Sequence, residues 1–429
     1  MGGRSAEALA RRAEKRGRSV EEQEATDESA HRKKHDLPEP KPIQPAPSKP
    51  ATSGAHRPRP KHPSPAGQHQ QNGWEAQREL NGKLARAGPQ DLHALVIEHG
   101  KIMNVVNCAT ALHRLAKCAP NSELRLGHSE GHWKKTWSLA LARSEGGVLD
   151  ETQVDALCAR TAARMGAEEV SARSLTSIAW AVAKLRLPHA ELLAALSAQA
   201  AVQLRRRALD AFGIANVVWA LATLREVHEA DAALLDACAE AACAMPGAFK
   251  PQELTNLLWG FATLKRRHGP LFEAMAATAT ARIGEFTPQG LSQTVWAYAK
   301  LNLAKHTLLL AAADAASPRG TMARYDPQSI ATLGWSFANL EVEHGPLLGA
   351  LSREALARPE AFDGASCAQL LWALSRLKDG VDAKAVAAMA RRLHTVSASG
   401  EGVNSQQLLY SLGALAKLPA GLLRRSSHE

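Results

Sequence analysis

The chain has 429 residues with a formal net charge of +10, and 45% of its residues are hydrophobic. This length suffices for about two or three domains or one long array, and the positive charge favours a polyanionic partner such as nucleic acid. No apolar run reaches the ~18 residues of a membrane-spanning helix, so no membrane contact is expected. The six cysteines form no CxxC pair and no zinc-type cluster, which predicts reduced thiols and neither metal nor cofactor.

Residues 1–73 are predicted to form a disordered arm. Large apolar residues are nearly absent, and a tract rich in proline, lysine, histidine and serine runs from Leu37 to Gly67. Such a segment cannot offset the entropy lost on ordering. Its basic residues can touch RNA loosely, although a solvated linker is the simpler interpretation. The first eighteen residues carry six arginines and lysines, as organelle transit helices do, whereas Glu7 and Glu14 are unusual in such peptides.

The segment 74–165 is predicted to hold degenerate helical repeats that cap an array. Residues 75–87 and 90–99 have helical spacing, and residues 104–115 resemble the repeat motif described next, with Thr110 in place of its tryptophan. Because Thr110 precedes Trp180 by 70 residues, close to two repeat periods, a further degenerate repeat is expected between them, around residues 133–143.

One motif recurs through residues 166–418. Its clearest copy reads Leu-Ser-Gln-Thr-Val-Trp-Ala-Tyr-Ala-Lys-Leu at 291–301, after Phe-Thr-Pro-Gln at 286–289. Copies are centred, at intervals of 37–40 residues, on Trp180, Trp219, Trp259, Trp296, Trp335, Trp372 and Tyr410. A regular period of this length is typical of a solenoid. The sequence therefore predicts an all-α fold, an α-solenoid of about seven to nine helical hairpins, with residues 419–429 as a tail.

Each repeat contains the signals of two helices, which we call helix A and helix B. Thr287 before Pro288 is an N-cap followed by proline at the first helical position of helix A, and Asp326-Pro327, Asp210 and Asp363 are equivalent starts. Helix A should end near the leucine five residues after the tryptophan. In the His-Gly-Pro sequences at 268–270 and 344–346, glycine is expected to terminate helix A and proline to start helix B.

Helix A is apolar on most of its circumference, and one narrow stripe stays polar. Numbered from the tryptophan as position 0, the stripe comprises positions −7, −3 and +4, which share one face of a helix. Position −7 holds Gln252, Gln289 and Gln328; position −3 holds Ser177, Asn216, Asn256, Gln293, Thr332, Gln369 and Gln407; position +4 holds Lys184, Thr223, Thr263, Lys300, Asn339 and Arg376.

A ladder of amides, hydroxyls and cations repeated once per hairpin is the arrangement with which helical-repeat proteins read single-stranded RNA. Amides suit base edges because they offer a donor and an acceptor, while lysine and arginine attract phosphates. An alternative for the −3 amides is a structural hydrogen bond to a neighbouring backbone carbonyl. For the tryptophans, packing between repeats is the stronger interpretation, ahead of stacking on bases. The basic clusters at 205–207, 265–267 and 391–392 lie at helix ends and can form a positive rim.

The motif Leu-x-Asn/Gln-x-x-Trp-Ala-x-Ala-x-Leu with its Phe-x-Pro-Gln lead-in resembles the octotricopeptide-like repeats of organellar RNA-binding proteins. It is similar to the leucine-rich region of FAST-kinase-domain proteins and to a trypanosome RNA-editing substrate-binding complex subunit. The resemblance covers residues 104–418. It implies a helical superhelix that binds single-stranded RNA selectively in mitochondria or plastids, with roles in RNA processing, stability or translation. Many such proteins end in an RAP domain, and none is expected in the residues that follow the last repeat.

No catalytic motif is present: the sequence lacks a P-loop, a GxGxxG after a strand, HExxH and GxSxG, so an enzyme and a small-molecule substrate are not expected. Three hypotheses remain. The protein is an organellar RNA-binding solenoid, a HEAT-like scaffold that holds a protein partner without touching RNA, or an accessory subunit of an RNA-processing complex that binds RNA weakly.

Overall fold

The structure is a computed structural model that describes residues 65–119, 149–225, 227–377, 381–398 and 413. These residues form sixteen α-helices, short 3-10 turns and no strand, which confirms the all-α solenoid prediction. None of the helices in these ranges has the length and apolar character needed to span a bilayer. The predicted repeat at 133–143, the copy around Tyr410 with its Gln407, and residues 1–64 lie outside the described residues.

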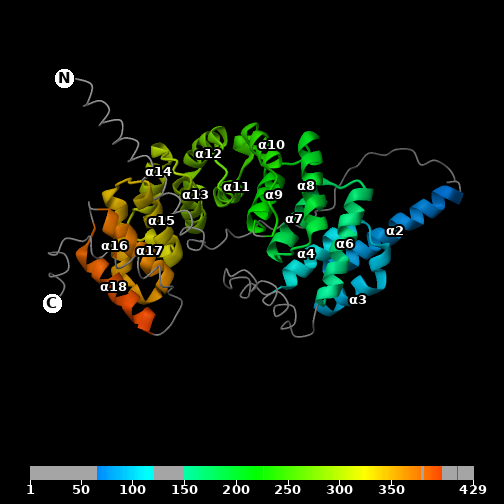
Figure 1. The fold of residues 1–429 in the computed structure, drawn as a ribbon, viewed down its shortest axis with the longest axis horizontal. Coiled ribbons are helices and arrows are strands. Elements are labelled where there is room, and N and C mark those ends of the chain that lie inside the picture. The colour runs from blue at the N-terminus through cyan, green and yellow to red at the C-terminus, as the bar shows by residue number, and fades with distance from the viewer. Residues whose placement is uncertain (1–64, 120–148, 226, 378–380, 399–412, 414–429) are drawn as a thin grey trace, which may run out of the picture.

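The helices stack in two layers that form an arch (Figure 1). Helices of type A make the inner layer: α2 (Pro65–Arg86), α4 (Val105–Cys118), α7 (Ala172–Lys184), α9 (Ala211–Thr223), α11 (Pro251–Thr263), α13 (Pro288–Lys300), α15 (Pro327–Asn339) and α17 (Gly364–Arg376). Helices of type B make the outer layer: α3 (Pro89–His99), α6 (Glu151–Ala167), α8 (Ala190–Arg205), α10 (Ala232–Cys243), α12 (Gly269–Ala281), α14 (His306–Ala316), α16 (Gly345–Ala357) and α18 (Ala383–Ala398).

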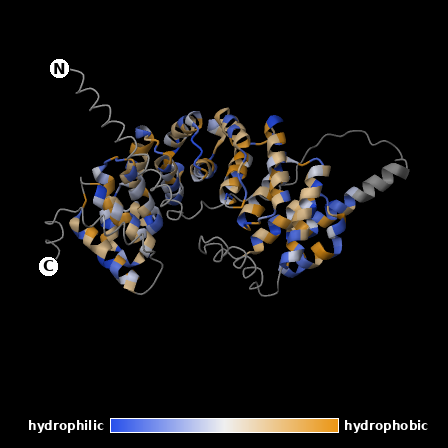
Figure 2. Cartoon of the chain, in the orientation of Figure 1, coloured by the Kyte–Doolittle hydropathy of each residue, from blue (hydrophilic) through white to orange (hydrophobic). Residues whose placement is uncertain are grey.

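Each A helix packs against the next A helix, and from α6 onward each B helix packs against the next B helix. Every hairpin therefore buries its apolar faces only against its neighbours in the stack, as in other solenoids. Hydrophobic residues occur along the helices of both layers (Figure 2). Helix α2 begins at Pro65, inside the region that the sequence assigned to the arm.

The predicted starts of the A helices are confirmed. The side chains of Asp210, Thr287, Asp326 and Asp363 each accept a hydrogen bond from a backbone N–H in the first turn, at 2.7–3.1 Å. Proline follows in α13 and α15 at the first helical position, where its missing N–H costs nothing.

The prediction that glycine terminates helix A in the His-Gly-Pro turns is wrong. Helix A ends instead in residues with left-handed backbone, such as Lys265 and Glu341, with φ of 53° and 55°. Gly269 is already the first residue of α12, and His268 is its cap, because the ring Nδ1 accepts from Leu271 N at 3.2 Å. A histidine ring can replace the usual N-cap oxygen because its unprotonated nitrogen is an acceptor.

The further repeat expected between Thr110 and Trp180 falls within residues 120–148, which lie outside the described residues. Helix α4 packs directly against α7, and α6 packs against both α4 and α8. Thr110 and Trp180 therefore stand on A helices that are in direct contact.

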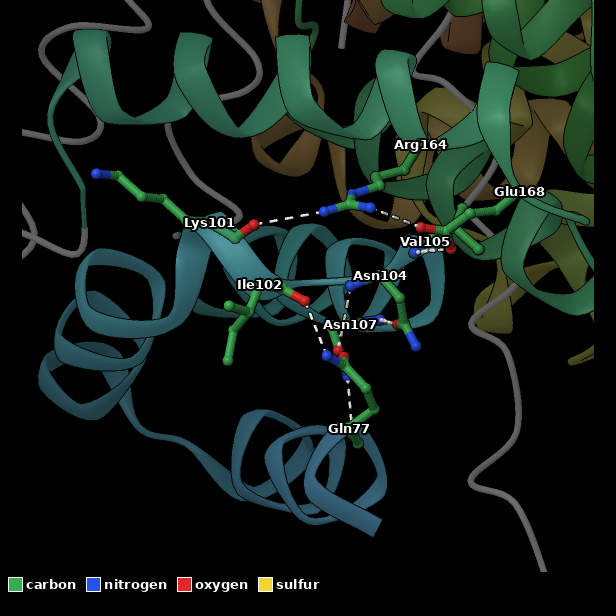
Figure 3. A network of polar contacts seen from close by, with 8 residues as sticks. All are labelled: Gln77, Lys101, Ile102, Asn104, Val105, Asn107, Arg164 and Glu168. Carbon is green, nitrogen blue, oxygen red and sulfur yellow. Dashed lines mark hydrogen bonds and ion pairs between the residues drawn. The ribbon is translucent and has the colours of Figure 1, made fainter. Parts of the chain in front are cut away.

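A network of polar contacts joins α4 and α6 to α2 (Figure 3). Gln77 of α2 donates to Ile102 O at 2.8 Å and accepts at its backbone oxygen from Asn107 Nδ2 at 3.1 Å. Glu168, after α6, accepts from Val105 N at 2.9 Å and pairs with Arg164. The contacts link backbone at the start of α4 with side chains of both neighbours, so the N-terminal hairpins are fixed parts of the array.

The spacing between A helices is close where side chains are small. A Cβ added to Gly260 of α11 would lie 2.7 Å from Val218 Cγ1 and 3.1 Å from Val218 O. Only glycine therefore permits the observed approach of α11 to α9. Around this contact the tryptophans at position 0 are buried from Trp180 to Trp335, while Trp372 is half-buried.

Candidate nucleic-acid interface

The inner layer of the arch presents one accessible stripe. The A helices are covered by their B helices on one side and by neighbouring A helices on two others, so the remaining side faces the concave surface. In α7, α11, α13 and α15, the residues at positions −7 and +4 are partly or fully exposed. The accessible positions thus belong to the polar stripe that the sequence predicts on helix A.

The residues of position −7 lie at the surface. Gln252 is exposed, and Gln289 and Gln328 are half-buried. Ser177, at position −3 of α7, is also half-buried. Gln328 accepts from Ser366 Oγ at 3.3 Å and lies 3.5 Å from Gln369 Oε1, so it bridges α15 and α17.

Two of these glutamines meet in a pocket between α13 and α15. Its lining is entirely polar: Gln289, Ser292, Gln293, Asp326, Gln328, Ser329 and Thr332. Asp326 is engaged, because its two oxygens accept from Ser329 N at 2.7 Å and Ser329 Oγ at 3.1 Å. The pocket thus brings together the −7 and −3 positions of two consecutive repeats around a space that fits about one water molecule.

The −3 row, in contrast, is covered. Asn216 and Asn256 are 0% exposed, Gln293 is 4%, Thr332 is 2% and Gln369 is 7%. The expectation that these side chains line an open channel is therefore wrong for Asn216 and Asn256, and only Gln293 and Thr332 reach the pocket. Helix A packs more deeply between its neighbours than a helical wheel shows, because the wheel ignores how far each side chain projects.

The structural alternative for the −3 amides is realised in one place. Asn107, the −3 residue of α4, is buried and donates to the backbone of α2 through Gln77 O. Asn216 instead donates within its own helix, to Phe212 O at 2.9 Å. Asn256 has no hydrogen-bond partner at either amide atom. The −3 amides of α9 and α11 therefore do not bond the neighbouring repeats.

The +4 row is more varied. Lys184 and Lys300 are half-buried, and Arg376 is exposed and pairs with Glu341 at 3.2 Å. Asn339 donates to Ala299 O of α13 at 3.0 Å, so this amide joins two repeats. The row also holds two hydroxyls, Thr223 and Thr263, whose Oγ1 atoms are buried without a partner.

Unpartnered polar atoms concentrate on this stripe. Among the described residues, most buried side-chain polar atoms without a hydrogen-bond partner lie at positions −3, 0 and +4 of four consecutive A helices. They are Nε1 of Trp180, Trp219 and Trp296, Oδ1 of Asn216, both amide atoms of Asn256, and Oγ1 of Thr223 and Thr263. Each such atom costs about 1–3 kcal/mol in the free protein. Groups of this kind find their partners in ordered water or in a bound ligand.

The tryptophans are packing residues. The rings of Trp335 and Trp372 stack at 6.4 Å between centroids, which joins α15 to α17. Trp180 lies 4.8 Å from the His113 ring of α4. Because the rings from Trp180 to Trp335 are enclosed, they are not available as platforms for bases in this conformation.

One titratable group on this face responds to pH. Burial, followed by the charges of Lys117 and Arg114, lowers the pKa of His113 from its ordinary value of 6.5 to about 4. Between these values the unfolded chain binds a proton that the folded chain does not. The free energy of unfolding should therefore fall as pH decreases from about 6.5 to about 4, and this contribution is fully present above 6.5. Chemical denaturation across this range measures it, with His113→Phe as the control that keeps a ring against Trp180. Equal pH dependence in both proteins would contradict it.

Residues missed from the sequence lie at the N-terminal end of the stripe. His113, Arg114 and Lys117 of α4 adjoin Lys184 of α7, and the alignment of residues 104–115 with the motif already places Arg114 at position +4. Asp326 and Ser329 of the pocket were recognised only as helix-start residues.

The described part of the chain shows no group of side chains that suggests catalysis or metal binding. No cluster of three or more histidine, cysteine or acidic side chains can hold a metal ion there. The six thiols are free, and burial raises the pKa of Cys108 to about 11 and of Cys158 to about 12, so these sulfurs are protonated and unreactive near neutral pH.

Residues 148–344 match the family model of the RNA-editing substrate-binding complex 6 protein. The matched segment begins just before α6 and ends at His344, the cap of α16. The match confirms, for these residues, the resemblance inferred from the repeat motif. No curated protein matches the chain.

Proposed function

From the match of residues 148–344 to the RNA-editing substrate-binding complex 6 protein family, we propose that this protein is a non-catalytic RNA-binding subunit of an organellar RNA-editing or RNA-processing complex. Single-stranded RNA lies along the concave face of the arch, in a mitochondrion or plastid. The observation that carries the proposal is the row of unpartnered polar atoms on consecutive A helices, beneath the accessible −7 and +4 residues.

The residues proposed to contact RNA fall into an accessible group and a covered group. Gln252, Gln289 and Gln328 of position −7, with Lys184 and Lys300 of position +4, are accessible in this conformation. Gln293, Thr332 and Gln369 lie just below them, and Ser177 and Arg376 extend the stripe to its two ends. Asn216, Asn256, Thr223 and Thr263 are covered and meet RNA only when neighbouring hairpins move apart. Solenoids allow such movement because each hairpin contacts only its neighbours.

The burial of the −3 row, together with the inter-repeat bond of Asn339, favours a second candidate, a HEAT-like scaffold that holds a protein partner. Salt separates the two. RNA binding that neutralises about three phosphates should weaken roughly tenfold or more between about 50 and 200 mM salt. The reason is that binding releases counterions from the RNA, and this release is less favourable at higher salt concentration. Binding of an apolar helix should hardly respond.

The test is fluorescence anisotropy with a labelled single-stranded RNA pool. Gln252→Ala with Gln289→Ala should weaken binding by about 1–3 kcal/mol, the cost of two or more lost hydrogen bonds. Gln90→Ala is the matched control, because Gln90 is exposed on α3 of the outer layer. No RNA binding at low salt, or equal loss in the control, would contradict the proposal and leave the scaffold.

A further inference from the structure

The C-terminal ends of α4 and α7 form a cluster of cations. Arg114 and Lys117 lie on α4, Lys184 is the last residue of α7, and the two helices pack side by side. The charges that act most strongly on His113 come from Lys117, Arg114 and Lys184, followed by Arg173, and no carboxylate is among them. Burial, followed by the charge of Lys117, lowers the pKa of Lys184, and Cys118 acts in the opposite direction.

Two buried ring nitrogens without a hydrogen-bond partner lie beside these cations. Trp180 is fully buried, and its Nε1 has no hydrogen-bond partner. The His113 ring lies 4.8 Å from Trp180, and its buried Nε2 also lacks a partner. Lys184 Nζ is 5.3 Å above the Trp180 ring. An indole N–H, an imidazole nitrogen and two ammonium groups thus converge at one place.

The other end of the array provides an internal comparison. Arg376 lies 5.2 Å over Trp372, in the same position relative to its tryptophan as Lys184. There, Glu341 pairs with the guanidinium at 3.2 Å and balances its charge. At the α4–α7 end, no carboxylate of residues 65–119 or 149–225 is recorded in this role. A half-buried lysine beside another lysine is costly because burial and like charge both disfavour its charged form. The cost is removed when an anion binds.

We infer that the α4–α7 cluster, which we call the basic seam (His113, Arg114, Lys117, Trp180 and Lys184), is a phosphate-binding site that anchors one phosphate of bound RNA at the N-terminal end of the concave face. Arg114 is held in place because its guanidinium donates to Ala87 O, between α2 and α3. Lys117 and Lys184 supply the mobile charges beside the Trp180 and His113 rings. The inference rests on the proposed function for the identity of the ligand.

The experiment compares Lys117→Gln with Lys184→Gln, as a double variant, against Arg205→Gln with Arg267→Gln. The control pair removes the same charge from exposed residues at other helix ends. In the RNA arm, the seam variant should bind the labelled RNA pool at least tenfold more weakly, and its log–log salt slope should be shallower by about 0.7, the value for one phosphate of a single strand that is no longer neutralised. The control should lose less than about threefold through the general field.

A second arm uses inorganic phosphate alone and does not depend on RNA. Millimolar phosphate should raise the melting temperature of the wild-type protein above that in chloride at equal ionic strength, and the seam variant should lose this shift. Without any anion the seam variant should be at least as stable as wild type. RNA binding by wild type that falls equally in both variants, with no phosphate shift, overturns the site and leaves the proposed function. A variant-sensitive phosphate shift without RNA binding overturns RNA as its ligand and the proposed function with it.

Discussion

Replacing Trp296 with alanine is expected to lower the free energy of unfolding by about 3–5 kcal/mol, the usual cost of truncating a buried aromatic side chain. Trp296 is 3% exposed and belongs to the hydrophobic core that runs through the A helices. The indole fills the contact between stacked hairpins, so the lost area and the cavity both act on one inter-repeat interface. Denaturant unfolding followed by circular dichroism measures the change.

Trp296→Phe is the matched control. Because Trp296 Nε1 has no hydrogen-bond partner, this variant loses part of the buried area and no hydrogen bond, so its loss should be clearly smaller. In a solenoid the damage can stay local and appear as a separate transition of the hairpins beside α13. A loss below about 1 kcal/mol for the alanine variant would show that the tryptophans do not hold the repeats together.

Replacing Asn256 with alanine is expected to raise the free energy of unfolding by about 1–2 kcal/mol. The amide is fully buried and neither of its polar atoms has a partner, so its removal relieves a cost of about 1–3 kcal/mol. Alanine also has about 0.5 kcal/mol better helix propensity, which roughly offsets the small cavity left behind. The same variant should bind RNA more weakly, because the proposed contact set includes this amide.

Asn107→Ala tests the same position in a different environment. The Asn107 amide donates to Gln77 O at 3.1 Å, so its removal should destabilise the protein by about 1 kcal/mol or more. Opposite signs for the two variants, measured by the same denaturant titration, would separate a structural amide from an unpartnered one. If Asn256→Ala destabilises as Asn107→Ala does, the amide of Asn256 makes a structural hydrogen bond, and its role in RNA contact is contradicted.

Much of the fold follows from local sequence signals, because each repeat carries its own. The repeats show a regular tryptophan spacing, helix caps such as Asp326 before Pro327, and an apolar circumference of helix A. The structure confirms the helix starts and the packing between hairpins that these features predict. His268 was misjudged because glycine is the commoner helix terminator, whereas here the left-handed Lys265 ends α11.

The site was less accessible to sequence reasoning. Periodicity identified the stripe of helix A but not how deeply each position lies, which depends on the distance between packed helices. Position −3 is covered in α9 and α11, where glycine at 260 permits a close approach, while Gln289 at position −7 reaches the pocket. The basic seam joins residues 70 positions apart, such as Arg114 and Lys184, and becomes visible only once α4 is known to pack on α7.

The most direct test of RNA binding on the concave face is ultraviolet crosslinking of single-stranded RNA to the full chain, with the crosslinked residues identified by mass spectrometry. The account predicts crosslinks at or beside positions −7 and +4 of the A helices, including Gln252, Gln289 and Lys300, and at the basic seam. Crosslinks confined to the outer B helices, or to residues 1–64 alone, would contradict it.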